Sequence, residues 1–124
     1  MKLRRKDFDK AVQRAIRRIP HEIRQHLDNV LISVQESPSP EILEAMGLPP
    51  DEPLLGLYQG ASLLERSAVY PPLYPDTIFI FQKPLEEMCE TIGELEEQIE
   101  ITVVHEVAHF IGIDEERLME LGYE

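Results

Sequence analysis

The amino-acid sequence predicts an α+β fold, with helices packed on a small mixed sheet of three or four strands. Three observations lead to this class. An amphipathic helix opens the chain, short segments rich in β-branched residues occupy its middle, and a long helix followed by a shorter one ends it. The 124 residues suit one domain, 1–124, and 43% of them are apolar, which is enough for a hydrophobic core.

The N-terminal third is expected to hold two helices and a strand. Apolar residues recur at helical spacing from about 7 to 19, basic residues fill the other side, and Pro20 ends the helix. The segment 21–27 is predicted to form a short second helix. The alternating, β-branched segment 30–36 predicts the first strand.

The middle of the chain alternates between loops and strands. Residues 41–46 are expected to form a helical turn that Gly47 closes, before a loop rich in proline and acidic residues. Strands are predicted over 54–60 and, with a weaker signal, over 68–70. The clearest strand covers 77–82, because its first five residues all favour β-structure.

The C-terminal third is predicted to be helical. Pro84 is well placed to open a helix, because a proline at the first helical position loses no hydrogen bond. A long helix is expected from about 93 to 111, with Gly112 ending it in a left-handed conformation. A final short helix is predicted over 115–121.

Charge divides the chain into two unequal parts. Residues 1–24 carry a net charge of +6 and residues 25–124 one of −18. Such a basic segment can bind nucleic acid or anionic lipid, but we interpret it as a solvated helix face and expect neither nucleic acid nor membrane as a partner. No apolar run approaches the ~20 residues that span a bilayer, and no secretory signal is expected, because no apolar stretch follows the basic N-terminus. Since Cys89 is the one cysteine, no internal disulfide can form, and a cytoplasmic protein is expected.

One segment of the long helix carries residues that can perform chemistry. His105-Glu106-Val107-Ala108-His109 is an HExxH motif, with two imidazoles four residues apart and therefore on one helix face. Two imidazoles so placed can bind Zn²⁺, and Glu106 lies beside the metal without binding it. Glu106 is the expected catalytic base, which takes a proton from a zinc-bound water and passes it to a leaving amine.

A third protein ligand is expected downstream, because a catalytic zinc site usually has three. Gly112 lets the chain turn back toward the metal, and Asp114 is the expected N-cap of the last helix. Glu115, six residues after His109, is then the favoured third ligand. The acidic residues that remain open as alternatives are Asp114, Glu116 and Glu120.

Several other candidate residues are interpreted as structural. The histidines at the ends of the segment 21–26 are five residues apart, so their rings diverge on a helix and we expect them on the surface. Cys89 is expected to be a packed helix residue, with a thiol pKa raised by its acidic neighbours. Arg66 is expected to pair with an acidic residue. The tyrosines that we expect to pack, rather than to stabilise an oxyanion, are Tyr70, Tyr74 and Tyr123.

The extended motif His105-Glu106-x-x-His109-x-x-Gly112-x-x-Glu115 resembles the zincin pattern HExxHxxGxx followed by His or Asp. Nearly the whole chain is similar to the minimal zincins, which are small, mostly bacterial zincin-like metallopeptidase domains. The segments that carry this likeness are 54–60, 65–67, 76–81, 84–86 and 102–122. The resemblance implies a minimal zincin core with the motif helix near the C-terminus, and two histidines with an acidic third ligand. In this sequence Glu115 stands where Asp is usual.

Two functions compete on these observations. The first is a zinc-dependent metallopeptidase that hydrolyses bonds of a peptide or protein substrate. The alternative is a zinc-binding regulatory or protein-interaction module without peptidase activity. Glu106 favours the first, because a structural zinc site normally has four protein ligands and no base. The small size of the chain favours the second, because few residues remain to build a substrate cleft. A third and weaker hypothesis is a nucleic-acid or membrane module built on the basic first helix.

Overall fold

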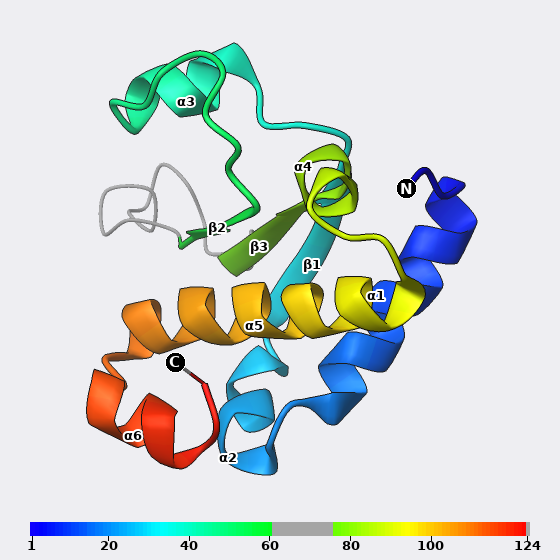
Figure 1. Cartoon of the computed structure of the whole chain (residues 1–124). Helices are drawn as coiled ribbons and strands as arrows, with labels where there is room; N and C mark the ends of the chain where they lie inside the picture. The colour runs from blue at the N-terminus through cyan, green and yellow to red at the C-terminus, as the bar shows by residue number, and fades with distance from the viewer. Residues whose placement is uncertain (61–75, 124) are drawn as a thin grey trace.

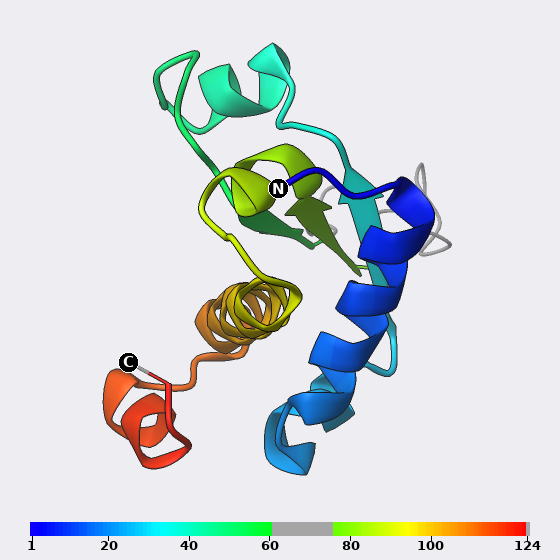
Figure 2. The same ribbon diagram turned by 45° about the vertical axis from the view of Figure 1, so that its right-hand side comes forward.

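The computed structural model describes residues 1–60 and 76–123, and it has a small sheet with two long helices on one face (Figure 1, Figure 2). In chain order, the elements are α1 (Arg5–Arg18), α2 (His21–Arg24), the 3-10 helix η1 (Gln25–Leu27), β1 (Val30–Gln35), α3 (Pro40–Ala45), β2 (Gly56–Gln59), β3 (Asp76–Phe81), α4 (Gln82–Glu87), α5 (Ile92–Ile111) and α6 (Glu115–Glu120). The predicted α+β class is confirmed. Within the described ranges, no helix combines the length and the apolar character needed to cross a membrane.

Strand β3 lies between the other two strands of the sheet. β1 pairs parallel to it, with Val30 opposite Asp76, and β2 pairs antiparallel to it, with Gly56 opposite Ile80. The sheet is mixed, as predicted, and it has three strands in the part of the chain that the structure describes. Predictions that lie outside the described residues are the weak strand at 68–70 and the roles of Arg66, Tyr70 and Tyr74.

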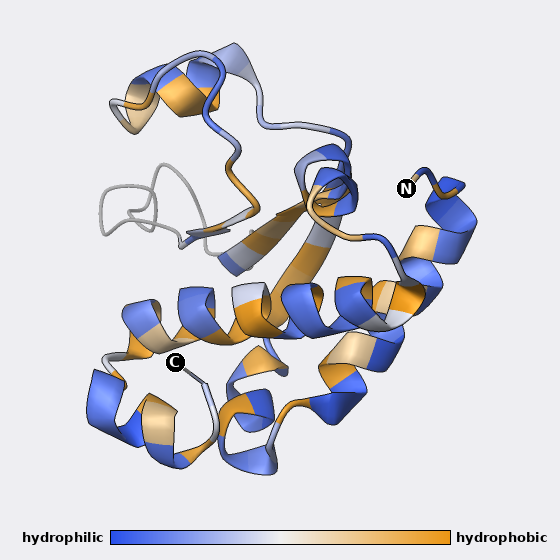
Figure 3. Cartoon of the chain, viewed as in Figure 1, coloured by the Kyte–Doolittle hydropathy of each residue, from blue (hydrophilic) through white to orange (hydrophobic). Residues whose placement is uncertain are grey.

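The hydrophobic core lies between the sheet and the two long helices. Ile78 and Ile80 of β3 are fully buried and belong to the same cluster as the apolar sides of α1 and α5. Figure 3 shows hydrophobic colour along β1 and β3, and alternating hydrophilic and hydrophobic colour along α1 and α5. The residues that α1 buries in this core are Phe8, Ala11, Val12 and Ala15. The amphipathic first helix is therefore packed on its predicted apolar side.

Capping residues fix both ends of α5. At its start, Thr91 Oγ1 accepts a hydrogen bond from the Glu94 amide at 3.1 Å, and Glu94 Oε1 accepts one from the Thr91 amide at 3.0 Å. Hydrogen bonds from the backbone amides of Glu90 and Thr91 hold the pKa of the Glu94 carboxyl below its usual range. At the other end, Gly112 has a φ of 80°, so the predicted left-handed end of the helix is confirmed.

Three predicted details need correction. Helix α4 begins at Gln82 rather than at Pro84. A proline is tolerated anywhere in the first helical turn, because the amides of that turn have no hydrogen-bond partner within the helix. The strand predicted over 54–60 is shorter, since the Leu54 amide still donates to Glu52 O in the preceding turn. Cys89 is buried, as predicted, but it lies in the connection between α4 and α5 and not in a helix. Burial raises the pKa of the Cys89 thiol, and the nearby acidic residue at position 94 adds to this effect.

Helix α5 approaches strand β2 very closely at Gly56. A methyl group placed on Gly56 would lie 2.6 Å from Thr102 Cγ2 and 3.0 Å from the carbonyl oxygen of Phe79. Side chains in a close-packed interior do not approach at such distances, so this position accommodates only glycine without a shift of its neighbours. Gly56 therefore permits the close contact between helix and strand.

The Gly56→Ala substitution should lower the free energy of unfolding by about 1–3 kcal/mol, the usual cost of overpacking. In that background, Thr102→Ser should recover part of the loss, because it removes the methyl group that the new side chain meets. Gly93→Ala is the matched control, since the nearest atom to a methyl group there is 3.9 Å away. Urea unfolding measures all four proteins. A Gly56→Ala variant as stable as the wild type would show that the helix is not held this closely.

Candidate metal centre

His105, Glu106 and His109 lie in the last two turns of α5. Val103 and Val107 are buried and anchor the helix on the side away from the two histidines. As a result, His105 and Glu106 are half-buried and His109 is exposed. The three side chains stand at the rim of the core, where a metal ion could be reached from solvent.

Glu106 is held by strand β2. Its Oε1 atom accepts a hydrogen bond from the backbone amide of Tyr58 at 2.8 Å. Sequence reasoning missed this contact. Two patterns could have indicated it: positions 56, 58 and 60 share one face of a strand, and positions 102, 106 and 110 share one face of a helix. The sequence does not show, however, which strand the helix packs against.

An aromatic pair lies next to Glu106 in the contact between α5 and β2. The Phe110 ring stacks on the Tyr58 ring, with centroids 4.1 Å apart and planes inclined by 16°. The Tyr58 hydroxyl donates a hydrogen bond to Asp76 Oδ2 at 2.8 Å. Phe110 is 52% exposed, and a methyl group at Gly60 would lie 2.8 Å from its ring. The motif is therefore bordered by a partly exposed aromatic surface.

Helix α6 begins at the predicted N-cap residue. Asp114 Oδ1 accepts a hydrogen bond from the Arg117 amide at 2.8 Å, which confirms Asp114 as the N-cap. Glu115, the first residue of α6, is exposed. Of the alternative ligands, Glu116 is exposed and Glu120 accepts a hydrogen bond from Arg117 Nη1 at 2.8 Å. The capping role thus occupies Asp114 and leaves the Glu115 carboxylate outside that bond.

Arg117 ties α6 to α2. Its Nε donates to Glu22 Oε2 at 2.8 Å, and its Nη2 donates to Glu22 Oε1. The Arg117 guanidinium holds the pKa of the Glu22 carboxyl below its usual range. Because both side chains are exposed to solvent, this pair orients α6 more than it stabilises the fold.

The chemistry of the motif side chains suits a zinc ion. His105 and His109 share a helix face one turn apart, and imidazoles with a nearby carboxylate are ligands that zinc prefers. Within residues 1–60 and 76–123, however, no three His, Cys, Asp or Glu side chains are grouped so that they could hold a metal ion. The histidine pair fits the metal, and Glu115 as the third ligand stays a prediction. His21 and His26 are both exposed, as predicted.

A buried tyrosine fastens the segment after α6 to α5. Tyr123 is 6% exposed, and its hydroxyl donates to Glu100 Oε2 at 2.5 Å. Arg18 of α1 lies with its Nε 3.1 Å from Glu100 Oε1. Burial, and then the neighbouring Glu100, raise the pKa of Tyr123. Tyr123 therefore packs as predicted, and it also joins the C-terminal segment to both long helices.

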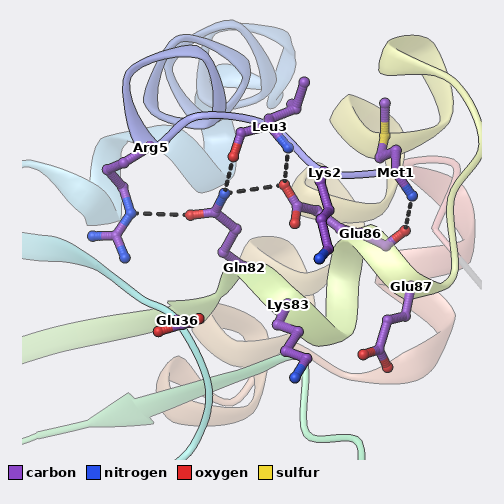
Figure 4. Close-up of a pocket in the computed structure, with 9 residues that line it drawn as sticks. All are labelled: Met1, Lys2, Leu3, Arg5, Glu36, Gln82, Lys83, Glu86 and Glu87. Carbon is purple, nitrogen blue, oxygen red and sulfur yellow. Dashed lines mark hydrogen bonds between the residues drawn. The ribbon is translucent and has the colours of Figure 1, made fainter.

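A separate hollow of about 480 Å³ lies between the N-terminal segment and α4 (Figure 4). Its buried polar side chains bind the chain itself. Glu86 Oε2 accepts a hydrogen bond from the Leu3 amide at 2.8 Å, and Gln82 Nε2 donates to Leu3 O at 2.9 Å. Arg5 Nε donates to Gln82 Oε1 at 3.0 Å. These groups hold the N-terminal segment on α4, so we do not assign the hollow to a ligand.

Comparison with models of protein families gives a match over most of the chain. A family described as zincin-like metallopeptidase matches residues 27–123, more than three quarters of the sequence. The matched range begins after α2 and includes the three described strands and helices α3 to α6. A comparison with curated proteins finds no match.

The Tyr123→Phe substitution should lower the free energy of unfolding by about 1 kcal/mol near neutral pH, because the hydrogen bond to Glu100 is lost. This difference should shrink as the pH rises above about 10, the ordinary pKa of tyrosine. Above that pH, Tyr123 ionises in the unfolded wild type but stays protonated in the folded protein, so only the wild type loses stability there through this residue. Urea unfolding of both proteins at roughly pH 8 and pH 11 measures the difference. A difference that stays constant or grows would contradict the assignment.

Proposed function

Because the chain belongs to the family of zincin-like metallopeptidases, we propose that it is a zinc-dependent peptidase in which His105 and His109 bind the metal and Glu106 is the catalytic base. The observation that carries the proposal is the position of Glu106. It lies between the two histidines along α5, and its carboxylate reaches the backbone of strand β2. Peptide hydrolysis by a metal-activated water needs a general base within reach of that water, and the two neighbouring imidazoles would hold the metal beside Glu106.

The residues of the chain have separate tasks in this reaction. When bound, zinc would polarise the scissile carbonyl and lower the pKa of a water molecule toward ~7. Glu106 takes a proton from the attacking water as the water oxygen forms its bond to the carbonyl carbon. The C–N bond then breaks, and Glu106 gives the proton to the leaving amine nitrogen. His105 and His109 would hold the metal through their imidazole nitrogens.

A peptide or protein substrate fits the surroundings of Glu106 best. Strand β2 lies at the edge of the described sheet beside Glu106, so an extended peptide can lie along it with its scissile bond near the proposed base. The stacked pair of Tyr58 and Phe110 supplies apolar surface beside the same strand. We propose a peptide or protein as the partner, and neither nucleic acid nor membrane.

A second function is favoured by one observation. The stacked rings of Tyr58 and Phe110 form a partly exposed aromatic surface beside the motif, which also suits contact with another protein by a zinc-binding regulatory or protein-interaction module without turnover. Such a module would bind zinc through His105 and His109 and use Glu106 only as a hydrogen-bond acceptor. The two proposals differ in the expected effect of removing the Glu106 charge, because only the peptidase proposal expects this change to abolish a reaction.

The purified chain should bind one zinc ion, and His105→Ala or His109→Ala should abolish this binding, because each removes a ligand. Glu106→Gln should keep the metal and lose hydrolysis, since Glu106 is proposed as a base and not as a ligand. Metal analysis and digestion of a peptide library measure the two properties. His21→Ala is the control, because it removes an exposed histidine outside the motif. Loss of zinc from Glu106→Gln would refute the proposed roles.

Substitution of the two acidic residues at the start of α6 tests the third ligand. Glu115→Ala should weaken zinc binding about a hundredfold or more, because loss of a direct ligand costs at least as much as loss of an outer-shell partner. Asp114→Ala should cost about 1 kcal/mol of stability, as for any lost N-cap, with zinc binding retained. Glu41→Ala, which removes an exposed carboxylate from the first turn of α3, is the control for a lost negative charge. Zinc titration and thermal unfolding separate the two effects, and the reverse pattern would exchange the roles of Asp114 and Glu115.

A further inference from the structure

The amide of Tyr58 is directed away from the sheet. The Phe81 amide donates to Leu55 O at 3.0 Å, and β2 continues in register with β3 so that Tyr58 stands opposite Ile78. Hydrogen-bonded and non-hydrogen-bonded pairs alternate along an antiparallel ladder. Positions 55, 57 and 59 therefore bond to β3, and the amide of Tyr58 points outward, where it donates to Glu106 Oε1.

The match between helix and strand spacing brings Glu106 to this amide. Four residues of an α-helix advance about 6 Å, and two residues of a β-strand advance about 6.6 Å. Every fourth residue of α5 therefore lies next to every second residue of β2 over several contacts. Thr102 meets Gly56 on one side of Glu106, and Phe110 stacks on the Tyr58 ring on the other. The position of Glu106 along the strand is thus fixed by packing on both sides.

We propose that the Tyr58 backbone amide is a positioning group for Glu106. It holds one carboxylate oxygen in the free protein, so that the other oxygen is left for the attacking water. A glutamate side chain is flexible, and a half-buried one that is already ordered loses less freedom when substrate binds. The inference rests on the proposed function, since it assigns a means of orientation to the proposed base. If the contact only satisfied an outward amide of an edge strand, its loss would change stability and leave turnover unchanged.

Amide hydrogen exchange of the metal-free chain tests the contact without any reaction. The Tyr58 amide should exchange about tenfold or more faster in Glu106→Ala than in the wild type, because its acceptor is gone. Glu106→Gln should keep the protection, since the glutamine side chain retains an acceptor oxygen. The Leu57 amide, which belongs to a pair bonded to β3, is the internal control. Unchanged exchange of the Tyr58 amide in Glu106→Ala would overturn the inference.

A pair of substitutions at position 58 tests the effect on turnover. Tyr58→Ala removes the ring and keeps the amide, whereas Tyr58→Pro removes both, and proline is tolerated on an edge strand where the N–H points outward. The proline variant should have a kcat about tenfold or more below that of the alanine variant, with equal KM and equal zinc content. If the proline variant does not fold, replacing Tyr58 by its α-hydroxy analogue removes the same N–H and retains the ring.

The outcomes separate the inference from the proposed function. A kcat that is equal in the alanine and proline variants, or higher in the proline variant, would overturn the positioning role while the wild type remains an active peptidase. A wild-type chain that binds zinc and hydrolyses no peptide would overturn the proposed function, and with it the role of the amide in turnover. In that case the exchange measurement still decides whether the Tyr58 amide holds Glu106.

Discussion

The close contact between α5 and β2 is the constraint on which the rest of the structure depends. Gly56 has no side chain where Thr102 arrives, and one helical turn later Glu106 comes within hydrogen-bonding distance of the Tyr58 amide. A larger residue at position 56 would move the helix outward and separate the carboxylate from the strand. Since the same contact closes the core and orients Glu106, stability and the geometry of the candidate site are coupled in this protein.

Features with a strong local signal could be predicted from the sequence, whereas those that depend on docking could not. The left-handed end at Gly112 and the cap at Asp114 follow from neighbouring residues, and the HExxH spacing alone places two histidines on one helix face. The hydrogen bond between Tyr58 and Glu106 joins residues 48 positions apart, and a backbone amide leaves no mark in the sequence. The orientation of Glu115 likewise depends on how α6 packs, which local patterns do not determine.

Opposite charges at the two ends of the chain meet between the long helices. Arg14 pairs with Glu96 at 3.2 Å, and Arg18 pairs with Glu100 at 3.1 Å. Some of the basic residues of the N-terminal segment therefore form ion pairs with acidic residues of α5. Helix α1 lies outside the range 27–123 that matches the family, yet its fully buried Phe8 belongs to the same core as α5. In this chain, α1 completes the core that the matched region would otherwise leave open.

The packing of α1 on α5 has a consequence for folding during synthesis, because α1 is made long before its partner helix. A ribosome adds roughly 5–20 residues per second, so the apolar side of α1 waits on the order of ten seconds before α5 has been made. During that interval Phe8 and Val12 lack the apolar residues of α5 as packing partners, and contacts between residues so distant in sequence form slowly. The nascent chain is most exposed to aggregation and to chaperones in this period. The helix that carries the HExxH motif also ends that exposure, because its arrival closes the core.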